Sequence, residues 1–235
     1  MIDKSNFNLQ VFSKRVILKV INLLIIPLNK LDRIFEVIKR KKTTYPDELI
    51  LQDIFSEFQG ISNSKSLDLG SGPFPKNPFD AKQAYGVDLR NTTNLNVFVC
   101  DLSVDKLPFE DNSIDYISAY DVLEHIPRVT IENNKTIYPF INLMNEIYRV
   151  LKDDGVFFNT QPCYPSSSAF QDPTHINIMS EDTIELYFCK KNWAHIYGFN
   201  GSFEMLRDGW IGSSYFSLIK KVALINNFDN DYFQR

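Results

Sequence analysis

Short apolar runs alternate along this chain with longer stretches in which apolar residues recur at helical spacing. Seven runs have the length of strands: 65–69, 84–87, 96–100, 114–119, 156–159, 202–206 and 215–222. Residues 47–59 and 139–151 have the periodicity of amphipathic helices. Strands that alternate with crossovers predict an α/β fold. We expect a Rossmann-like, doubly wound, mostly parallel seven-stranded sheet with helices on both faces.

The first 42 residues differ from the rest in charge. They hold ten Lys/Arg against three Asp/Glu, whereas the remainder holds fifteen against twenty-six, and the chain has a net charge of −4. Residues 16–28 are the most apolar stretch, but a membrane span needs about 20 apolar residues, and no small-residue cleavage site follows them. An apolar stripe from Ile17 to Ile38 predicts an amphipathic helix. We therefore divide the chain into a basic amphipathic helical arm, residues 1–44, and a domain, residues 45–235.

The arm has more than one interpretation. It could dock on its own domain, as a lid over the active site, or residues 14–42 could contact an anionic membrane surface. Nucleic acid is disfavoured as a partner because the body of the protein is acidic. Three cysteines without CxxC spacing exclude a disulfide framework and give no zinc signature. We expect a cytoplasmic protein, with peripheral binding at the inner membrane face left open.

Polar residues follow four consecutive predicted strands. They are Asp68, Gly70 and Gly72 after the first, Asp88 after the second, Asp101 after the third, and Tyr120 and Asp121 after the fourth. In parallel sheets, ligands bind at the carboxyl ends of the strands. The sequence therefore predicts one binding site at this edge.

The residues at this edge narrow the choice of cofactor. Gly70 and Gly72 permit a tight turn and close approach of a ligand, and Asp88 can accept hydrogen bonds from ribose hydroxyls. A dinucleotide site needs a third glycine and a helix N-terminus for the pyrophosphate, but residues 73–78 hold three prolines and no glycine. An acidic rim suits a ligand with an amino group and a sulfonium. These features favour S-adenosylmethionine over a nicotinamide or flavin cofactor.

Several segments resemble, in order and spacing, the motifs of class I S-adenosylmethionine-dependent methyltransferases. They are 66–73, 85–88, 100–102, 107–115, 121–126 and 146–155. The resemblance spans about residues 60–160, the cofactor half, and indicates fold and cofactor but not substrate.

The resemblance also implies roles for single residues. The loop from Asp68 to Gly72 would lie against the methionine part of the cofactor, and Asp88 would hold the ribose. Asp101, with the backbone of Leu102, would read the adenine, and Tyr120 would lie near the methyl-transfer site. The chain departs from the family at its first crossover, which is short and proline-rich, so we expect no full helix there. Asp101 has a structural alternative, as a cap of the turn that follows it.

Methyl transfer depends mainly on alignment, and a general base is needed only when the acceptor must lose a proton. The candidates are His125, His175 and Asp172. Asp121, Glu124 and His125 resemble a magnesium-binding set in some O-methyltransferases of the family, but the same phrase is widespread where no metal is used, so we predict no metal. Alternatively, Asp172 begins a turn that His175 holds by local bonds.

Residues 161–180 are polar and aromatic and follow the fifth strand, which predicts a flap that binds the methyl acceptor. The phrase Asp172–Asn177 resembles a subset of bacterial family members linked to surface-glycan or small-molecule modification. We predict transfer of a methyl group to a hydroxyl or amine of a saccharide, a lipid-linked glycan or a small metabolite. The alternatives are an RNA methyltransferase that uses the arm, and a non-catalytic module that keeps the fold as a binding scaffold.

Overall fold

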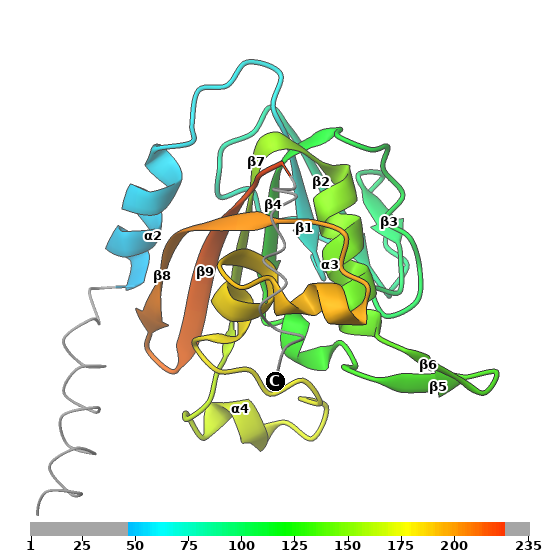
Figure 1. Cartoon of the computed structure of the whole chain (residues 1–235). Coiled ribbons are helices and arrows are strands. Elements are labelled where there is room, and N and C mark those ends of the chain that lie inside the picture. The colour runs from blue at the N-terminus through cyan, green and yellow to red at the C-terminus, as the bar shows by residue number, and fades with distance from the viewer. Residues whose placement is uncertain (1–46, 224–235) are drawn as a thin grey trace, which may run out of the picture. The chain divides into compact units, whose positions relative to one another are not determined.

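A computed structural model describes residues 47–223 of the 235-residue chain (Figure 1). The arm predicted for residues 1–44 lies outside the described residues, so its helix and its boundary with the domain stay predictions. Within residues 47–223, no helix combines the length and apolar character needed to cross a membrane.

The domain is built on one seven-stranded sheet. Its strands in chain order are β1 (Lys65–Leu69), β2 (Gln83–Asp88), β3 (Val97–Val99), β4 (Ile114–Tyr120), β7 (Leu151–Pro162), β8 (Phe203–Ile211) and β9 (Ser214–Lys221). In space the order is β3-β2-β1-β4-β7-β9-β8. The first five are parallel, while β9 pairs antiparallel with both β7 and β8. The predicted mostly parallel, Rossmann-like sheet is confirmed.

Helices cover both faces of this sheet, as predicted. Helix α2 (Asp47–Ser56) packs on one face and α3 (Pro139–Val150) on the other (Figure 1). Consecutive residues of a strand point to opposite faces, so Phe157 and Phe158 of β7 enter different cores. Phe158 packs in the cluster that contains Ile54 and Phe55 of α2, and Phe157 packs in the larger cluster that contains the apolar side of α3.

The irregular first crossover is also confirmed, because residues 70–82 contain turns and bends but no helix. The prediction that the fifth strand begins at residue 156 was wrong. Helix α3 ends at Val150, and β7 already begins at Leu151, which pairs with Ile114, rather than at Val156. The sequence Asp153-Asp154-Gly155 has the composition of a turn, but here it lies within a strand that is irregular at that point.

Several short elements were not predicted. They are the 3₁₀ turn η1 (Leu123–His125), the hairpin of β5 (Thr130–Glu132) and β6 (Lys135–Ile137), α4 (Ser168–Gln171), the π-helical turn η2 (Glu185–Cys189) and η3 (Trp193–Tyr197). Elements of three to five residues are too short to establish a hydrophobic period. All of them follow the carboxyl end of β4 or lie in the segment between β7 and β8.

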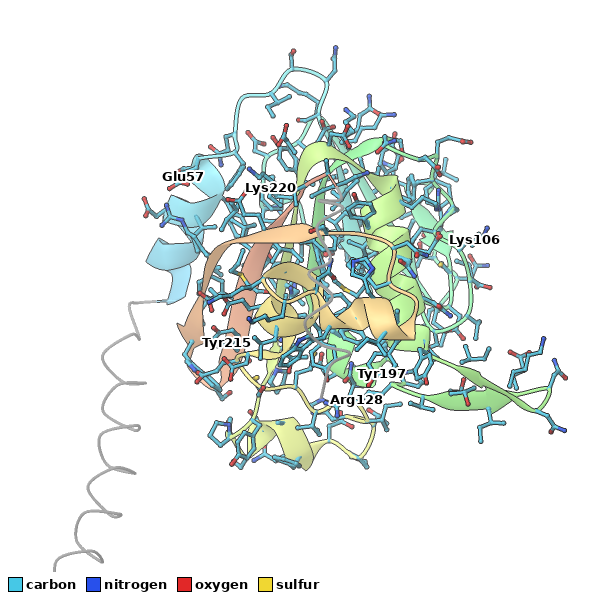
Figure 2. All side chains as sticks on the ribbon, in the orientation of Figure 1. Glu57, Lys106, Arg128, Tyr197, Tyr215 and Lys220 are labelled. Carbon is cyan, nitrogen blue, oxygen red and sulfur yellow. The ribbon has the colours of Figure 1, made fainter. Side chains whose placement is uncertain are left out.

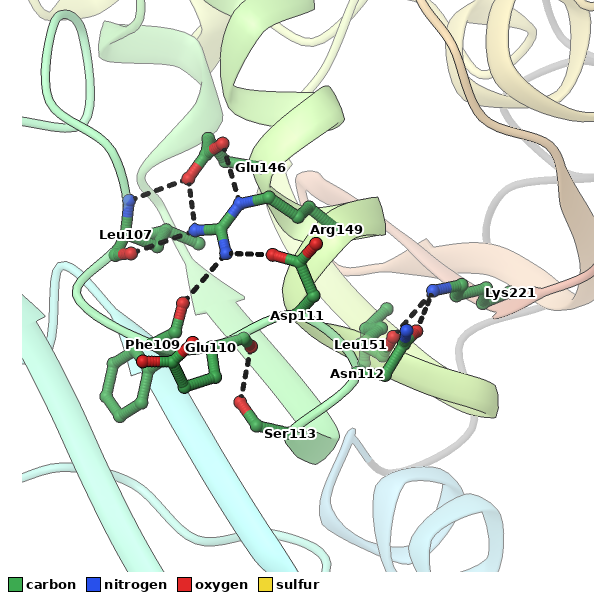
Figure 3. Close-up of polar contacts among 10 residues, drawn as sticks. All are labelled: Leu107, Phe109, Glu110, Asp111, Asn112, Ser113, Glu146, Arg149, Leu151 and Lys221. Carbon is green, nitrogen blue, oxygen red and sulfur yellow. Dashed lines mark hydrogen bonds and ion pairs between the residues drawn. The ribbon is translucent and has the colours of Figure 1, made fainter.

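The loop between β3 and β4 is fixed to α3 by one arginine (Figure 3). The Arg149 guanidinium donates to both carboxylate oxygens of Glu146, at 2.9 and 2.6 Å, and to the carbonyl oxygens of Leu107 and Phe109. It also pairs with Asp111 at 2.7 Å. This loop therefore has a structural role.

Candidate active site

The first strand ends in a glycine loop with a left-handed backbone. Gly70 has φ +65° and Gly72 has φ +58°. A β-carbon at Gly70 would lie 2.6 Å from a methyl carbon of Val122, in the segment after β4. The loop is therefore packed directly against the segment that leads to η1, and only glycine fits at residue 70.

Asp68, the first predicted cofactor residue, is 2% exposed. Its Oδ1 accepts a hydrogen bond from the Ser118 hydroxyl at 2.7 Å, and its Oδ2 accepts one from the backbone N–H of Lys76 at 2.8 Å. Burial raises the pKa of this carboxyl. Asp68 therefore links β1 to β4 and to the first crossover. Its buried hydrogen bonds help to fix the glycine loop that follows β1.

Asp88 lies at the end of β2 and faces the same loop. Its Oδ2 accepts a hydrogen bond from the N–H of Gly72 at 2.8 Å. Arg90 donates its backbone N–H and its Nε to Oδ1, at 2.9 and 2.8 Å, and its Nη2 to Oδ2 at 3.2 Å. Hydrogen bonds from the Arg90 side chain lower the pKa of Asp88 to about 2. The sequence analysis missed Arg90.

The third strand delivers Asp101 and Leu102 to the same edge. The Asp101 Oδ1 accepts a hydrogen bond from the N–H of Ser103 at 2.9 Å, so the carboxylate does cap the turn that follows it. Leu102 is half-buried and packs against the larger core cluster. The proposed adenine contacts of both residues stay predictions.

Tyr120 ends β4. Its ring packs on Phe158, with centroids 5.4 Å apart, and the Lys76 Nζ lies 3.8 Å from its centroid. Burial raises the pKa of the Tyr120 hydroxyl, so it remains protonated at neutral pH. Lys76 was not predicted as part of the site. It lies in the irregular crossover, where no helix or strand period tells which way a side chain points.

The three predicted catalytic residues lie close together, although they come from two separate segments of the chain. His125 belongs to η1, while Asp172 and His175 lie after α4. The two imidazole rings meet edge to face, with centroids 4.9 Å apart, and the His175 Nε2 lies 4.0 Å from the Asp172 Oδ2. Asp172 also accepts the N–H and the hydroxyl of Thr174, at 2.8 and 2.6 Å, which makes it the start of a turn as well.

Glu124 lies beneath this cluster and is 1% exposed. Burial raises its pKa to about 7, and the nearby carboxylates of Asp121 and Asp172 contribute. The sequence placed Glu124 next to His125 but gave no sign that its carboxyl group is buried.

A cavity of about 550 Å³ lies next to the cluster. Its walls are mainly aromatic and aliphatic, among them Tyr138, Phe140, Tyr164 and Phe188. Arg128 and Tyr197, which Figure 2 labels, also line it. Asn177 connects cavity and cluster, because its N–H donates to the carbonyl oxygen of Glu124 at 2.9 Å.

The predicted flap, residues 161–180, therefore does contribute to a cavity, through Tyr164 and residues 177–180. The three consecutive serines Ser166, Ser167 and Ser168 do not line this cavity. The hydroxyl oxygens of Ser166 and Ser168 lie 2.8 Å apart, and Ser168 also donates to the carbonyl oxygen of Ser213. These hydroxyl groups thus bind each other and the turn between β8 and β9, and the part of the flap that lines the cavity is largely apolar.

Comparison with known proteins identifies the domain. A family model described as a methyltransferase domain matches residues 67–159, which run from β1 into β7 and contain the glycine loop, Asp88 and Asp101. The chain therefore contains a methyltransferase domain, as the resemblance of its motifs to S-adenosylmethionine-dependent methyltransferases implied. No curated protein sequence matches the chain.

Solved structures similar to the methyltransferase include three distant ones. An S-adenosylmethionine-dependent methyltransferase from Aquifex aeolicus has 18% identity and a TM-score of 0.48, with 79% of this chain and 97% of that chain covered. One from Archaeoglobus fulgidus has 16% identity and a TM-score of 0.47, with 80% and 100% covered. A methyltransferase of Haloferax volcanii, in complex with the Trm112 activator, has 12% identity and a TM-score of 0.49, with 73% and 88% covered.

The residues of the methyltransferase fit S-adenosylmethionine. Gly70 and Gly72, both with positive φ, give the loop at the end of β1 two positions without side chains, and Asp88 places an ionised carboxylate beside it. Asp88 and the glycine loop are the groups that would hold the cofactor's ribose and its methionine part.

Proposed function

We propose that this methyltransferase methylates a hydroxyl group on an acceptor with a substantial apolar or aromatic part, such as a lipid-linked glycan or an aromatic small metabolite. The observation that supports it is the mainly apolar cavity beside the cluster of His125, His175 and Asp172. Pockets of 300–1,000 Å³ with apolar walls and a few polar groups are typical of small-molecule sites. A bare saccharide would leave most of these walls without a suitable partner.

The reaction requires alignment and removal of one proton. The bound cofactor supplies a methyl group on a sulfonium, so that the bond from the acceptor oxygen to carbon forms as the bond from sulfur to carbon breaks. The cavity would hold the apolar part of the acceptor and thereby align its hydroxyl. The cluster offers the imidazoles of His125 and His175 as acceptors for the hydroxyl proton.

An RNA acceptor has less support. Single-stranded RNA sites combine basic grooves with exposed aromatic platforms. Here five aromatic side chains in addition to Tyr164 line a cavity, and Arg128, which also lines it, donates to Asn177 at 2.7 Å. An apolar acceptor accounts for this lining and RNA does not.

The test is transfer of a labelled methyl group from S-adenosylmethionine to separated fractions of lipid-linked glycans, aromatic metabolites, water-soluble saccharides and RNA. Label should enter a lipid-linked or aromatic fraction, and Phe188→Ala, which removes a cavity wall, should raise KM for that acceptor about tenfold or more. The matched control is Phe109→Ala, which truncates a phenylalanine away from the cavity. Label found only in saccharides or RNA would refute the proposal.

We also propose that residues 14–42 bring the enzyme to the inner face of an anionic membrane. The support is the sequence, in which a basic run, Lys39 to Lys42, adjoins an apolar stripe. The full chain should sediment with vesicles that contain phosphatidylserine, and less with neutral ones. Replacing the four basic residues of the run with glutamine should reduce this binding. Equal sedimentation of both proteins would contradict a membrane role for the arm.

A further inference from the structure

Two histidines and a glutamate converge beside the cavity. One potential ligand atom from each of Glu124, His125 and His175 lies within 4.8 Å of the others. Glu124 and His125 are neighbours in η1, whereas His175 is fifty positions further along the chain, in the flap. The fold therefore assembles a set of ligands that the sequence does not show as one motif.

The carboxylate of Glu124 is the group that most needs a partner. It is 1% exposed, and neither oxygen has a hydrogen-bond partner among residues 47–223. The nearest basic group is the His175 Nε2, 4.0 Å from its Oε1, beyond hydrogen-bond distance. Buried carboxylates are normally hydrogen-bonded, paired or bound to a metal. Glu124 is therefore arranged to receive a cation.

The two histidines have the orientation of metal ligands. The His125 Nδ1 lies 3.2 Å from the carbonyl oxygen of Thr174, and the His175 Nδ1 lies 3.3 Å from that of Ala169. A hydrogen on each Nδ1 would be donated to these carbonyls, and the lone pair would then be on Nε2. A backbone carbonyl that fixes the far nitrogen is the usual support of a metal-bound histidine.

We propose that Glu124, His125 and His175 bind a divalent transition-metal ion. Two imidazole nitrogens and one carboxylate oxygen suit Zn²⁺, Mn²⁺, Fe²⁺ or Co²⁺ better than Mg²⁺, which prefers oxygen ligands. Bonds of about 2.0–2.2 Å would draw the three side chains together by about 1 Å. Asp172, whose Oδ2 is 4.0 Å from the His175 Nε2, lies close enough to support the site.

The place of the site gives the ion a role, and this step rests on the proposed function. Three protein ligands leave at least one position open, as in catalytic metal sites. Val122, two residues before Glu124, contacts the glycine loop, and Asn177 of the cavity wall is bonded to Glu124. The open position would take the acceptor oxygen and lower its pKa. With the ion bound, the hydroxyl proton would leave to solvent, and the two imidazoles would serve as ligands in place of the base role that they have without it.

The experiment is a titration of the full chain, freed of metal with a chelator, with Co²⁺, followed by visible absorption. About one Co²⁺ per chain should bind, with the bands of a nitrogen-coordinated ion, and Zn²⁺ should displace it. Glu124→Gln and His175→Gln should each weaken binding at least about tenfold. His195→Gln and Glu185→Gln, which change the same residue types outside the cluster, should bind Co²⁺ as the unmodified protein does.

Two further measurements keep the outcome unambiguous. The circular dichroism spectrum of each variant shows whether it is folded, and Zn²⁺ should raise the Tm of the unmodified protein but not that of Glu124→Gln. Binding of S-adenosylhomocysteine to the metal-free protein tests the methyltransferase function separately. The metal site is refuted if S-adenosylhomocysteine binds but Co²⁺ binds the unmodified protein and Glu124→Gln equally, or binds neither of them. Catalysis by an imidazole base would then be the explanation of the cluster.

Discussion

At the scale of single residues, the hydrogen-bonding positions of the Asp88 carboxylate are already occupied by protein groups. Four hydrogen bonds reach its two oxygens, three of them from Arg90, and a carboxylate has about four lone-pair positions. Ribose hydroxyls can bind Asp88 only if the Arg90 side chain moves away. That side chain is 74% exposed, so it can leave without disturbing the core.

This competition gives a prediction for Arg90→Ala. Removing the guanidinium frees Asp88, so the affinity for S-adenosylhomocysteine should rise by about two- to fivefold, because exposed ion pairs are weak. Asp88→Ala should lower the affinity at least about tenfold. Isothermal titration calorimetry measures both. A loss of affinity in Arg90→Ala would mean that Arg90 itself holds the cofactor.

The pKa of Asp88 also predicts a pH dependence. Its pKa falls from an ordinary 3.8 to about 2 in the folded protein. A carboxyl whose pKa is lowered by folding adds stability that is present above the unfolded pKa and is lost as pH falls through the folded pKa. The difference in Tm between the unmodified protein and Asp88→Asn should therefore be constant above about pH 5 and shrink below pH 4. A difference that changes between pH 5 and 8 would show that another group titrates with it.

At the scale of elements, the loop between β3 and β4 depends on α3 through Arg149. This side chain is 26% exposed and joins Glu146, Asp111 and two backbone carbonyls. The loop follows Asp101 and Leu102 in the chain, so Arg149 helps to fix the segment that the family resemblance places at the adenine.

Arg149→Ala should lower the free energy of unfolding by about 2–3 kcal/mol, because it leaves Glu146 and two carbonyls without their donor. Arg207→Ala is the matched control. Arg207 also pairs with a glutamate, Glu57, but both side chains are nearly half exposed, and the expected loss is below about 1 kcal/mol. Urea denaturation measures both, and equal losses would contradict a structural role for the network.

The elements also show what sequence could predict. The strands from β1 to β4 and helix α3 have clear hydrophobic patterns. The polar residues at the ends of the strands correctly predicted that Asp68, Asp88 and Asp101 lie at one edge of the sheet. The apolar cavity and the meeting of His175 with Glu124 could not be predicted. They depend on short turns such as η1 and α4, whose positions are set by tertiary contacts and not by periodicity.

At the scale of the whole molecule, all three cysteines lie among the described residues, where they are buried and form no disulfide. Burial raises the pKa of Cys100 to about 11 and that of Cys189 to about 12. Only the thiolate reacts readily with disulfide reagents, so the native protein should show no fast-reacting thiol at pH 8, and three after unfolding. Ellman's reagent with and without guanidinium measures this. Fast reaction of the native protein would show that part of the domain opens.

The central claim is that the edge formed by β1, β2 and β4 binds S-adenosylmethionine. Calorimetric titration with S-adenosylhomocysteine at neutral pH tests it most directly, with the unmodified protein, Asp88→Ala and the folded control Arg207→Ala side by side. We expect one ligand per chain for the unmodified protein and the control, and at least about tenfold weaker binding for Asp88→Ala. No binding to the unmodified protein, or equal binding to all three, would contradict this account.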